Sequence, residues 1–321
     1  MEEIIIPSGI KIGSYNDDYT GVTVIMCEKG AVAGVDVRGG APGTRETDLL
    51  RPEKAMEKIN AVVLSGGSAY GLASTCGVME YMRERGIGYK IGKKVVPIVC
   101  GAVIFDLNDK EYRYPAADWG YKACERATDK NVELGQAGVG KGATVGKIRG
   151  LAHAQKSGLG AATVKAGGCV VTAIVAVNAM GDITDGRGNI LAGATGKGGF
   201  INTERCLREG KWFTLLTGAN TTIGCVMTNA RLTKVEANKL ASITHNAYAK
   251  HISPVHTDFD GDTVFTMNTG IRRPYDFLLL QVAAVEAMGK AIMNAAQGAQ
   301  YKINYDEETP EAAEGGKDGE E

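Results

Sequence analysis

The stretch GANTTIGCVM, residues 218–227, sets a glycine and small polar residues directly before an apolar, β-branched run. This order predicts a strand that emerges from a loop at Thr221. If the Asn220–Thr221 peptide bond were cut, the new α-amine, with an ordinary pKa of about 7.7–8.0, would be a base for the hydroxyl of its own residue. Local sequence alone favours an ordinary turn, because Asn tolerates turns and Thr favours strands. The stretch is therefore either a plain turn or a nucleophile released by backbone cleavage.

Composition describes a nearly neutral chain that is long enough for a sizeable core. Its 321 residues hold 36 Lys and Arg against 37 Asp and Glu, so no basic surplus points to nucleic acid. The N-terminus is acidic with an apolar run of only three residues, which matches neither a signal peptide nor an anchor. No other stretch approaches the length of a membrane span in the sequence pattern, so we expect a soluble protein without a membrane partner.

Cysteine and glycine usage narrows the class further. The seven cysteines form no C-x-x-C pair, their number is odd, and most lie in apolar runs. This suits reduced, buried thiols, so we expect a cytoplasmic protein. The 44 glycines are about twice the usual share of roughly 7% and are spread along the chain, which predicts many tight turns.

Hydrophobic patterns predict a layered α+β sandwich rather than a doubly wound parallel sheet, because strand pairs and helices alternate without a regular βαβ rhythm. The acidic tail 306–321 is expected to be disordered. Before it, the patterns predict a hairpin of 22–27 and 31–37 around Glu28-Lys29-Gly30, and strands at 61–64, 95–105 (broken at Pro97), 169–177, 221–227 and 263–267. Helices are predicted at about 69–85, 119–126, 233–251 and 275–296. The first of these has Ser68 as N-cap and Gly86 as stop, and the third begins with a capping box of Thr233 and Glu236.

Two glycine-rich stretches resemble known motifs but depart from them. Ser65-Gly-Gly-Ser68 would be a nucleophile elbow, yet Tyr70 takes the place of the final glycine, and a plain strand-to-helix connection is favoured over an anion site. Residues 135–141 match G-x-x-x-x-G-K, but Gly142 stands where a P-loop needs Ser or Thr. A nucleotide site is therefore disfavoured. Lys147, beyond the next glycine turn, is either a solvated charge or a buried cation, and a surface lysine is the default.

Polar residues at strand ends are the remaining candidates. Asp258-Phe-Asp260-Gly-Asp262 starts like an EF-hand loop, but a strand follows and the required glycine is missing, which argues against calcium. Asp260 and Asp262 would lie on one side of the entering strand, where two carboxylates can orient a hydroxyl or amine; the alternative is a polar turn. Asn178 ends the most buried strand, as an oxyanion donor or a turn cap. Histidines 245, 251 and 256 follow no zinc spacing, so no metal is expected.

Six stretches together resemble the self-processing N-terminal-nucleophile hydrolases that include the L-aminopeptidase/D-esterase/amidases, the β-peptidyl aminopeptidases and the nylon-oligomer hydrolases. They occur in the family's order over nearly the whole chain: Ser65-Gly-Gly-Ser-Ala-Tyr-Gly71, Gly142-Ala-Thr-Val-Gly-Lys147, Val175-Ala-Val-Asn178, Asn220-Thr-Thr-Ile223, Thr228-Asn-Ala-Arg-Leu-Thr233 and Asp260-Gly-Asp-Thr-Val-Phe265. The resemblance implies a four-layer α-β-β-α sandwich over residues 1–305, cut at Asn220–Thr221 into a large chain, 1–220, and a small chain, 221–305. It also implies a homo-oligomer of cleaved units without a cofactor.

The resemblance also implies roles for single residues. Thr221 would be the nucleophile, with Asp260 and Asp262 orienting it. Asn178 would stabilise the oxyanion, and Lys147 would lend positive charge near the hydroxyl. Threonine with the double aspartate is most similar to the nylon-oligomer branch, whereas several relatives carry serine. The position of a pocket-lining tyrosine in relatives falls at Phe105, so one hydroxyl contact to substrate is missing here.

Three functions follow as hypotheses. The first is a self-cleaving threonine hydrolase of a small peptide, amide or ester, working through an acyl-enzyme. The second is an acyltransferase of the ornithine-acetyltransferase kind, which differs in passing the acyl group to an amine instead of water. The third, from another class, is a non-catalytic nucleotide-binding module that uses residues 135–141.

Overall fold

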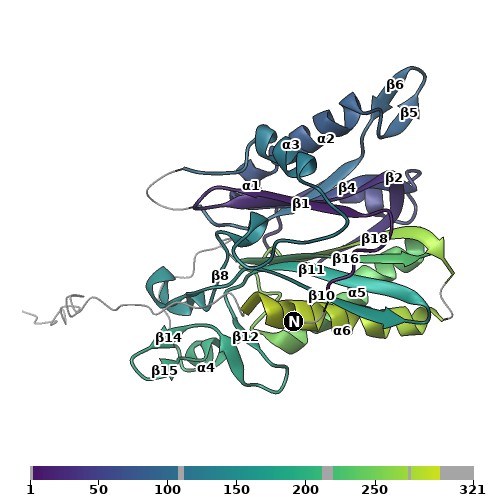
Figure 1. The fold of residues 1–321 in the computed structure, drawn as a ribbon. Coiled ribbons are helices and arrows are strands. Elements are labelled where there is room, and N and C mark those ends of the chain that lie inside the picture. Colours follow the sequence, from purple (N-terminus) through teal and green to yellow (C-terminus); the bar gives the residue numbers. More distant parts are fainter. Residues whose placement is uncertain (1–2, 108–111, 212–219, 274–275, 297–321) are drawn as a thin grey trace, which may run out of the picture.

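The main sheet is folded over on itself, and helices cover both of its outer faces (Figure 1). The computed structural model describes residues 3–107, 112–211, 220–273 and 276–296. Within them, nine strands follow the order β10-β11-β16-β18-β2-β4-β7-β3, with β1 also paired to β2. One half of the sheet comprises β10 (Leu159–Ala166), β11 (Cys169–Asn178), β16 (Thr221–Ala230) and β18 (Thr263–Arg272); the other comprises β1 (Lys11–Asn16), β3 (Thr44–Arg45), β4 (Lys58–Ser65) and β7 (Val99–Val103). The long strand β2 (Gly21–Val37) belongs to both halves, because residues 32–37 pair with β18 and residues 21–26 pair with β1.

Three apolar clusters lie between successive layers of the fold, so there are four layers. Helices α2 (Ser74–Glu84) and α3 (Ala117–Glu125) pack on one sheet half, and α5 (Lys234–His251) and α6 (Phe277–Ala296) pack on the other. Neighbouring residues of a strand point to opposite faces. Accordingly Val63 joins the cluster under α2 and α3, while Leu64 joins the cluster between the two sheet halves. The four-layer α-β-β-α sandwich of the α+β class is thus confirmed.

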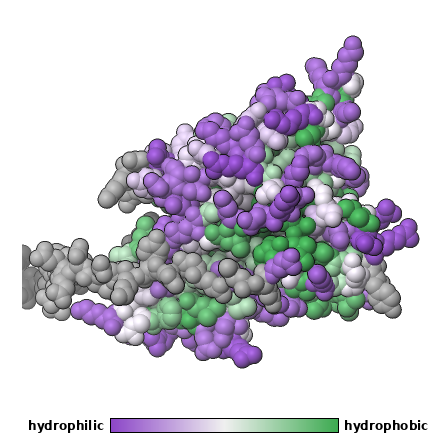
Figure 2. Space-filling view, viewed as in Figure 1, coloured by the Kyte–Doolittle hydropathy of each residue, from purple (hydrophilic) through white to green (hydrophobic). Residues whose placement is uncertain are grey.

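Shorter elements connect these layers. They are two short helices, α1 (Ser68–Gly71) and α4 (Thr203–Arg208), the short strands β5 (Tyr89–Ile91), β6 (Lys94–Val96), β8 (Thr144–Val145), β9 (Gln155–Lys156), β12 (Asp182–Thr184), β13 (Ile190–Ala192), β14 (Thr195–Gly196), β15 (Gly199–Phe200) and β17 (Ile252–Ser253), and the 3₁₀ turns Asp48–Leu50, Gly138–Gly140, Lys147–Arg149 and Leu151–His153. Hydrophilic atoms cover the layer with α2 and α3, whereas the apolar atoms visible on this face gather over the lower layers (Figure 2).

The hairpin predicted around Glu28-Lys29-Gly30 is wrong. Met26 pairs with Ala61 and Ala31 pairs with Ile59, so the chain continues along the same partner strand β4 instead of reversing. The intervening residues loop out as a bulge, with Gly30 at a φ of +75°. A glycine between two β-rich runs marks a bulge as well as a turn, and only the shared partner strand distinguishes the two.

The predicted helix 69–85 is interrupted, and Ser68 is not its N-cap. Two helices, α1 and α2, occupy this region, and the N-cap of α1 is Gly67, with no side-chain capping bond. Ser68 adopts a left-handed φ of +52°. The other end is as expected, because Gly86 follows α2 at a φ of +66°. The capping box of Thr233 and Glu236 at the start of α5 is also confirmed.

Helix α6 corrects the expectation about membrane-span length. It has 20 residues and, among the described helices, alone has the length and apolar composition of a span. Its buried residues, which include Leu280 and Met288, lie in the cluster beneath α5 and α6. Packing against the sheet accounts for these buried residues, whereas Leu278, Leu279 and Val282 are exposed. The predicted disordered tail, 306–321, lies outside the described residues.

Candidate active site

Three strand ends meet at Thr221. The antiparallel partner β11 ends where β16 begins, so Asn178 pairs directly with Thr221. Strand β18 runs parallel to β16 and therefore starts at the same edge of the sheet, where Asn220 bridges to Asp260. Thr221 is only 3% exposed in the uncleaved chain. The fold thus brings together Asn178 and Asp260, which are 82 positions apart in the sequence.

The hydroxyl of Thr221 lies on the carbonyl group that precedes it. Thr221 Oγ1 donates to the Asn220 carbonyl oxygen at 2.5 Å. The main-chain N–H of Gly261 donates to the same oxygen at 2.9 Å. A Cβ on Gly261 would lie 2.8 Å from Thr221 Oγ1 and 2.8 Å from the Ala41 carbonyl oxygen, which is closer than real Cβ contacts come. Because residue 261 is a glycine, its main chain fits between the Thr221 hydroxyl and the Ala41 carbonyl oxygen, and its N–H reaches the Asn220 carbonyl oxygen.

Asp262 holds the main chain beside the hydroxyl rather than the hydroxyl itself. Its side chain is fully buried, and Oδ1 accepts the N–H of Thr222 at 2.7 Å. Oδ2 accepts the main-chain N–H of His256 at 3.0 Å and its Nδ1 at 2.8 Å. In the uncleaved chain Asp262 therefore contacts the residue after Thr221 and not the Thr221 hydroxyl, to which the resemblance assigns it.

Asp260 is a buried carboxyl group with a raised pKa. Its Oδ2 accepts the main-chain N–H of Thr257 at 2.9 Å and the hydroxyl of that residue at 2.6 Å. Burial, followed by the charge of Asp262, raises the pKa of Asp260 to about 6, and the positive charge of Lys147 opposes the rise. Asp260 therefore changes protonation state near neutral pH, as a proton-transfer group requires.

Lys147 is a half-buried lysine rather than the solvated surface lysine taken as the default. Its Nζ donates to both the main-chain and side-chain oxygens of Asn178, each at 2.8 Å. Burial lowers the pKa of Lys147 to about 7, opposed by the negative charges of Asp260 and Asp106. The Asn178 amide nitrogen in turn donates to the carbonyl oxygen of Phe105 at 2.9 Å. All the predicted site residues therefore belong to one connected cluster around Thr221, with Phe105 joined through its main chain.

Sequence reasoning missed Asp106, which lies beside this cluster. Its carboxylate accepts the hydroxyl of Thr20 at 2.7 Å and the N–H of Gly67 at 2.6 Å. Burial raises the pKa of Asp106 to about 6, and these hydrogen bonds and the charges of Lys156 and Lys147 oppose it. The signal was an aspartate at the end of an apolar strand, the same pattern that marked Asn178. Asp106 thus connects its own loop, after β7, to the loops that contain Thr20 and Gly67.

Other stretches singled out in the sequence do not form the sites that they resemble. Residues 135–141 contain a 3₁₀ turn, Gly138–Gly140, and Gly135 bridges to Leu159, with no α-helix directly after them. A P-loop needs a strand before and a helix after its glycines, so this geometry does not support one. Among the residues with described positions, no group of three or more His, Cys, Asp or Glu side chains is arranged to hold a metal ion.

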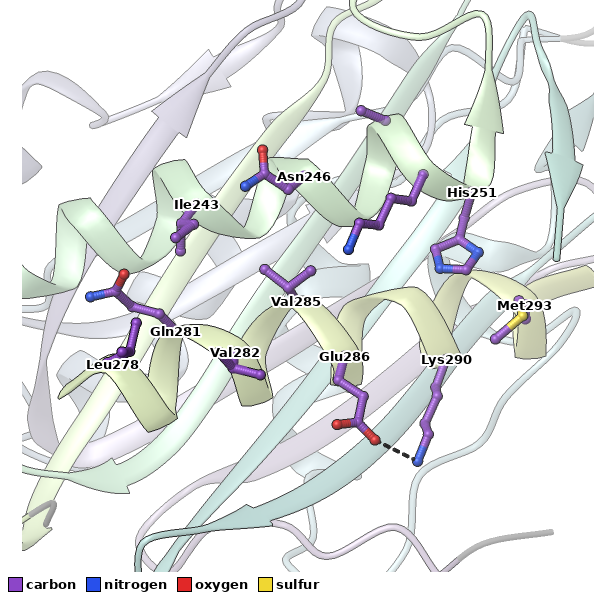
Figure 3. Close-up of a pocket in the computed structure, with 12 residues that line it drawn as sticks. Ile243, Asn246, His251, Leu278, Gln281, Val282, Val285, Glu286, Lys290 and Met293 are labelled. Carbon is purple, nitrogen blue, oxygen red and sulfur yellow. Dashed lines mark ion pairs between the residues drawn. The ribbon is translucent and has the colours of Figure 1, made fainter. Parts of the chain in front are cut away.

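A surface groove between α5 and α6 is separate from this cluster (Figure 3). Its lining includes Ile243, Leu278, Val282 and Val285, and a 3.1 Å ion pair joins Glu286 to Lys290. None of the candidate catalytic residues lines this groove. Half of its twelve lining residues are apolar, and no serine, threonine or cysteine lines it.

Comparison with known proteins agrees with this geometry. The profile of peptidase family S58 matches residues 7–308. The chain belongs to peptidase family S58. A protein named an uncharacterized aminopeptidase, from Mycobacterium leprae, is 39% identical over 298 residues, which cover 84% of this chain and 79% of that protein. A 6-aminohexanoate-oligomer endohydrolase of Kocuria sp. is 32% identical over 269 residues, covering 81% of this chain and 73% of that enzyme.

Solved structures show the same fold at lower sequence identity. The L-aminopeptidase D-Ala-esterase/amidase of Ochrobactrum anthropi, described as a variant of the N-terminal-nucleophile hydrolase fold, superimposes with a TM-score of 0.68 at 18% identity, covering 93% of this chain and 88% of that one. A β-aminopeptidase of Burkholderia sp. gives a TM-score of 0.63 at 20% identity, covering 90% and 84%. This S58 protein therefore has the fold of the N-terminal-nucleophile hydrolases. Its family name and the names of its relatives support hydrolysis of amide bonds.

Proposed function

We propose that this protein cuts its own backbone between Asn220 and Thr221 and then hydrolyses amide bonds of small peptides or amide oligomers with Thr221 as nucleophile. The S58 family and relatives named as aminopeptidase and oligomer endohydrolase support amide hydrolysis. The observation that carries the self-cleavage is the contact of the Thr221 hydroxyl with the Asn220 carbonyl group, which also receives the Gly261 N–H.

Self-cleavage proceeds by transfer of the acyl group from nitrogen to oxygen. Thr221 Oγ attacks the Asn220 carbonyl carbon, and the hydroxyl proton ends on the amide nitrogen as the C–N bond breaks. The Gly261 N–H stabilises the negative charge that develops on the carbonyl oxygen. Water then hydrolyses the ester, which leaves a carboxylate at Asn220 and frees both the hydroxyl and the α-amine of Thr221.

In the mature enzyme the same oxygen attacks a substrate amide. The α-amine of Thr221 takes the hydroxyl proton and returns a proton to the leaving amine, and water opens the acyl-enzyme. Lys147 and Asn178 place positive charge and an amide group beside the nucleophile. The pKa of Asp260, raised to about 6, and that of Lys147, lowered to about 7, let both groups exchange protons near neutral pH.

The intact mass of the purified protein under denaturing conditions tests the proposal. We expect two chains, of which the smaller begins at Thr221. Active protein that consists only of the 33.8 kDa chain would overturn it.

The acyltransferase hypothesis is tested by product analysis with and without an added amine acceptor. The nucleotide-binding hypothesis predicts thermal stabilisation by ATP and magnesium. Cytoplasmic location and self-association stay predictions, the latter checked by light scattering of the cleaved protein.

Gly261→Ala should slow self-cleavage at least about 10-fold, because the added methyl group pushes apart the donor and the Thr221 hydroxyl, and loss of one such donor costs about 10²–10³ in rate. The measurement is the half-time of chain separation on denaturing gels after rapid purification. Gly198→Ala is the control, since a Cβ there would meet nothing within 4 Å. Equal half-times for Gly261→Ala and Gly198→Ala would contradict the role of the Gly261 N–H.

The pH profile should depend on Lys147. As pH falls through about 6, Asp260 gains a proton and kcat/KM is expected to fall. Lys147→Met removes a charge that lowers the pKa of Asp260, so the acid limb of the remaining activity should move to higher pH. Lys156→Met is the control, because Lys156 acts on Asp106 rather than Asp260. If Lys156→Met moved the limb equally, Asp106 would be the titrating group.

A further inference from the structure

His256 directs two donors at one carboxylate oxygen of the site. Its main-chain N–H and its ring Nδ1 lie 3.0 and 2.8 Å from Asp262 Oδ2. The residue adopts a left-handed φ of +59°, a conformation that is unfavourable for a non-glycine residue. A strained backbone of this kind persists only where surrounding contacts fix it. The contact with Asp262 is therefore built into the fold.

Helix α5 holds the His256 ring in place. The ring centroid lies 4.8 Å from that of His245 and 5.8 Å from that of Tyr248, and both neighbours are fully buried. His245 is itself anchored by a 3.0 Å contact between Nε2 and the Asp36 carbonyl oxygen. Burial lowers the pKa of His245 to about 4, so this neighbour is uncharged at neutral pH. The His256 ring is therefore packed against two buried rings of α5, neither of which competes with Asp262 for Nδ1 as a charged partner.

The other oxygen of Asp262 connects this contact to the nucleophile. Oδ1 accepts the N–H of Thr222 at 2.7 Å, and Thr222 directly follows Thr221. Once Asn220 is released, the first residue of β16 becomes a chain end, and chain ends fray unless tied down. After the cut, the Thr222 N–H is the first main-chain amide of the small chain, and its hydrogen bond to Asp262 can still hold the start of β16 in place. This hydrogen bond sets the position of the Thr221 hydroxyl and amine only if the Asp262 carboxylate itself stays fixed.

We propose that His256 is a positioning residue, which holds Asp262 so that its carboxylate fixes the first peptide unit of β16 and with it the nucleophile. This inference rests on the proposed function of Thr221. His256 acts before the cut by aligning the hydroxyl with the Asn220 carbonyl group, and after it by restraining the new terminus. Misplacement of a reacting group by about 1 Å can cost about 10²-fold in rate.

Two variants separate the ring donor from the backbone. His256→Gly and His256→Asn both tolerate the left-handed conformation, but only asparagine keeps a side-chain N–H near the position of Nδ1. We expect His256→Gly to lower kcat roughly 10- to 100-fold with little change in KM and to slow self-cleavage similarly. His256→Asn should recover most of both losses. His251→Asn, whose ring instead contacts the Thr184 carbonyl oxygen, should match the unmodified protein.

Hydrogen exchange gives a readout that needs no turnover. In the Thr221→Ala chain, the Thr222 amide should exchange faster when His256→Gly is added, and not when His256→Asn is added. A Thr222 amide that is equally protected in all three chains would overturn the inference, as would a folded His256→Asn protein that is as slow as His256→Gly. Absence of amide hydrolysis by the unmodified protein would refute the proposed function and leave this exchange result as a separate test.

Discussion

Thr221→Ala is expected to remain a single 33.8 kDa chain and to lose at least about 10⁴-fold in amide hydrolysis. Thr221→Ala removes the hydroxyl that contacts the Asn220 carbonyl group, and without the cut no α-amine is released. Both stages therefore fail together. Denaturing gels and intact mass measure the first stage, and release of a chromogenic amine from an amino-acid anilide measures the second.

Two variants, Thr221→Ser and Thr222→Val, test whether the loss of activity comes from the Thr221 hydroxyl itself. Serine keeps a hydroxyl in the same place, so Thr221→Ser should retain part of both activities. Thr222→Val changes the adjacent, equally buried threonine, whose Oγ1 has no hydrogen-bond partner among the described atoms, and keeps the main-chain N–H that Asp262 accepts. It should separate into two chains normally. A Thr221→Ala protein that still separates would place the nucleophile elsewhere.

Asp262→Asn should lower both self-cleavage and kcat by roughly 100-fold or more. The carboxylate accepts three N–H groups, from Thr222 and twice from His256, whereas an amide turns one acceptor into a donor that faces them. Each buried donor left unpaired costs about 1–3 kcal/mol, so the melting temperature should also fall. Cleavage half-time, kcat and thermal unfolding are measured on the same preparation.

Asp182→Asn is the matched control for this loss. Asp182 is also buried, at 2% exposed, and its carboxylate accepts the N–H of Ala194 and both the N–H and hydroxyl of Thr203. The same substitution there should lower the melting temperature with a much smaller effect on self-cleavage. If the two variants lost activity in proportion to stability alone, Asp262 would have only a structural role.

The local pattern was sufficient where a strand or helix carries its own signal. The start of β16 at Thr221 and the capping box of α5 were both predicted, because a β-branched run after a glycine and a Thr-x-x-Glu sequence act over a few residues. The pattern failed for β2, where Glu28-Lys29-Gly30 has the composition of a turn but forms a bulge. Bulge and turn differ only in which strand the next residues pair with, and that partner, β4, lies about 30 residues further along the chain.

For the candidate site, sequence supplied the residue types and tertiary structure supplied the contacts. The resemblance placed Lys147 and Asn178 near Thr221, but the lowered pKa of Lys147 comes from burial, which a glycine turn in the sequence does not reveal. Asp106 was overlooked for the same reason, since its loops are joined only in three dimensions. Burial and long-range pairing depend on the assembled layers rather than on neighbours in the chain.

The sequence by itself determined the order of strands and helices in most of the chain, the position of Asn220–Thr221 at the start of a strand, and the pair of carboxylates at 260 and 262, because each of these depends on a short run of residues. Only the tertiary structure decided that Asp262 accepts hydrogen bonds from Thr222 and His256 instead of the Thr221 hydroxyl, and that the Gly261 N–H donates to the Asn220 carbonyl oxygen. The physical reason is that a buried polar group takes whichever partners the packed layers bring within hydrogen-bond distance, and those partners are set by the meeting of strand ends.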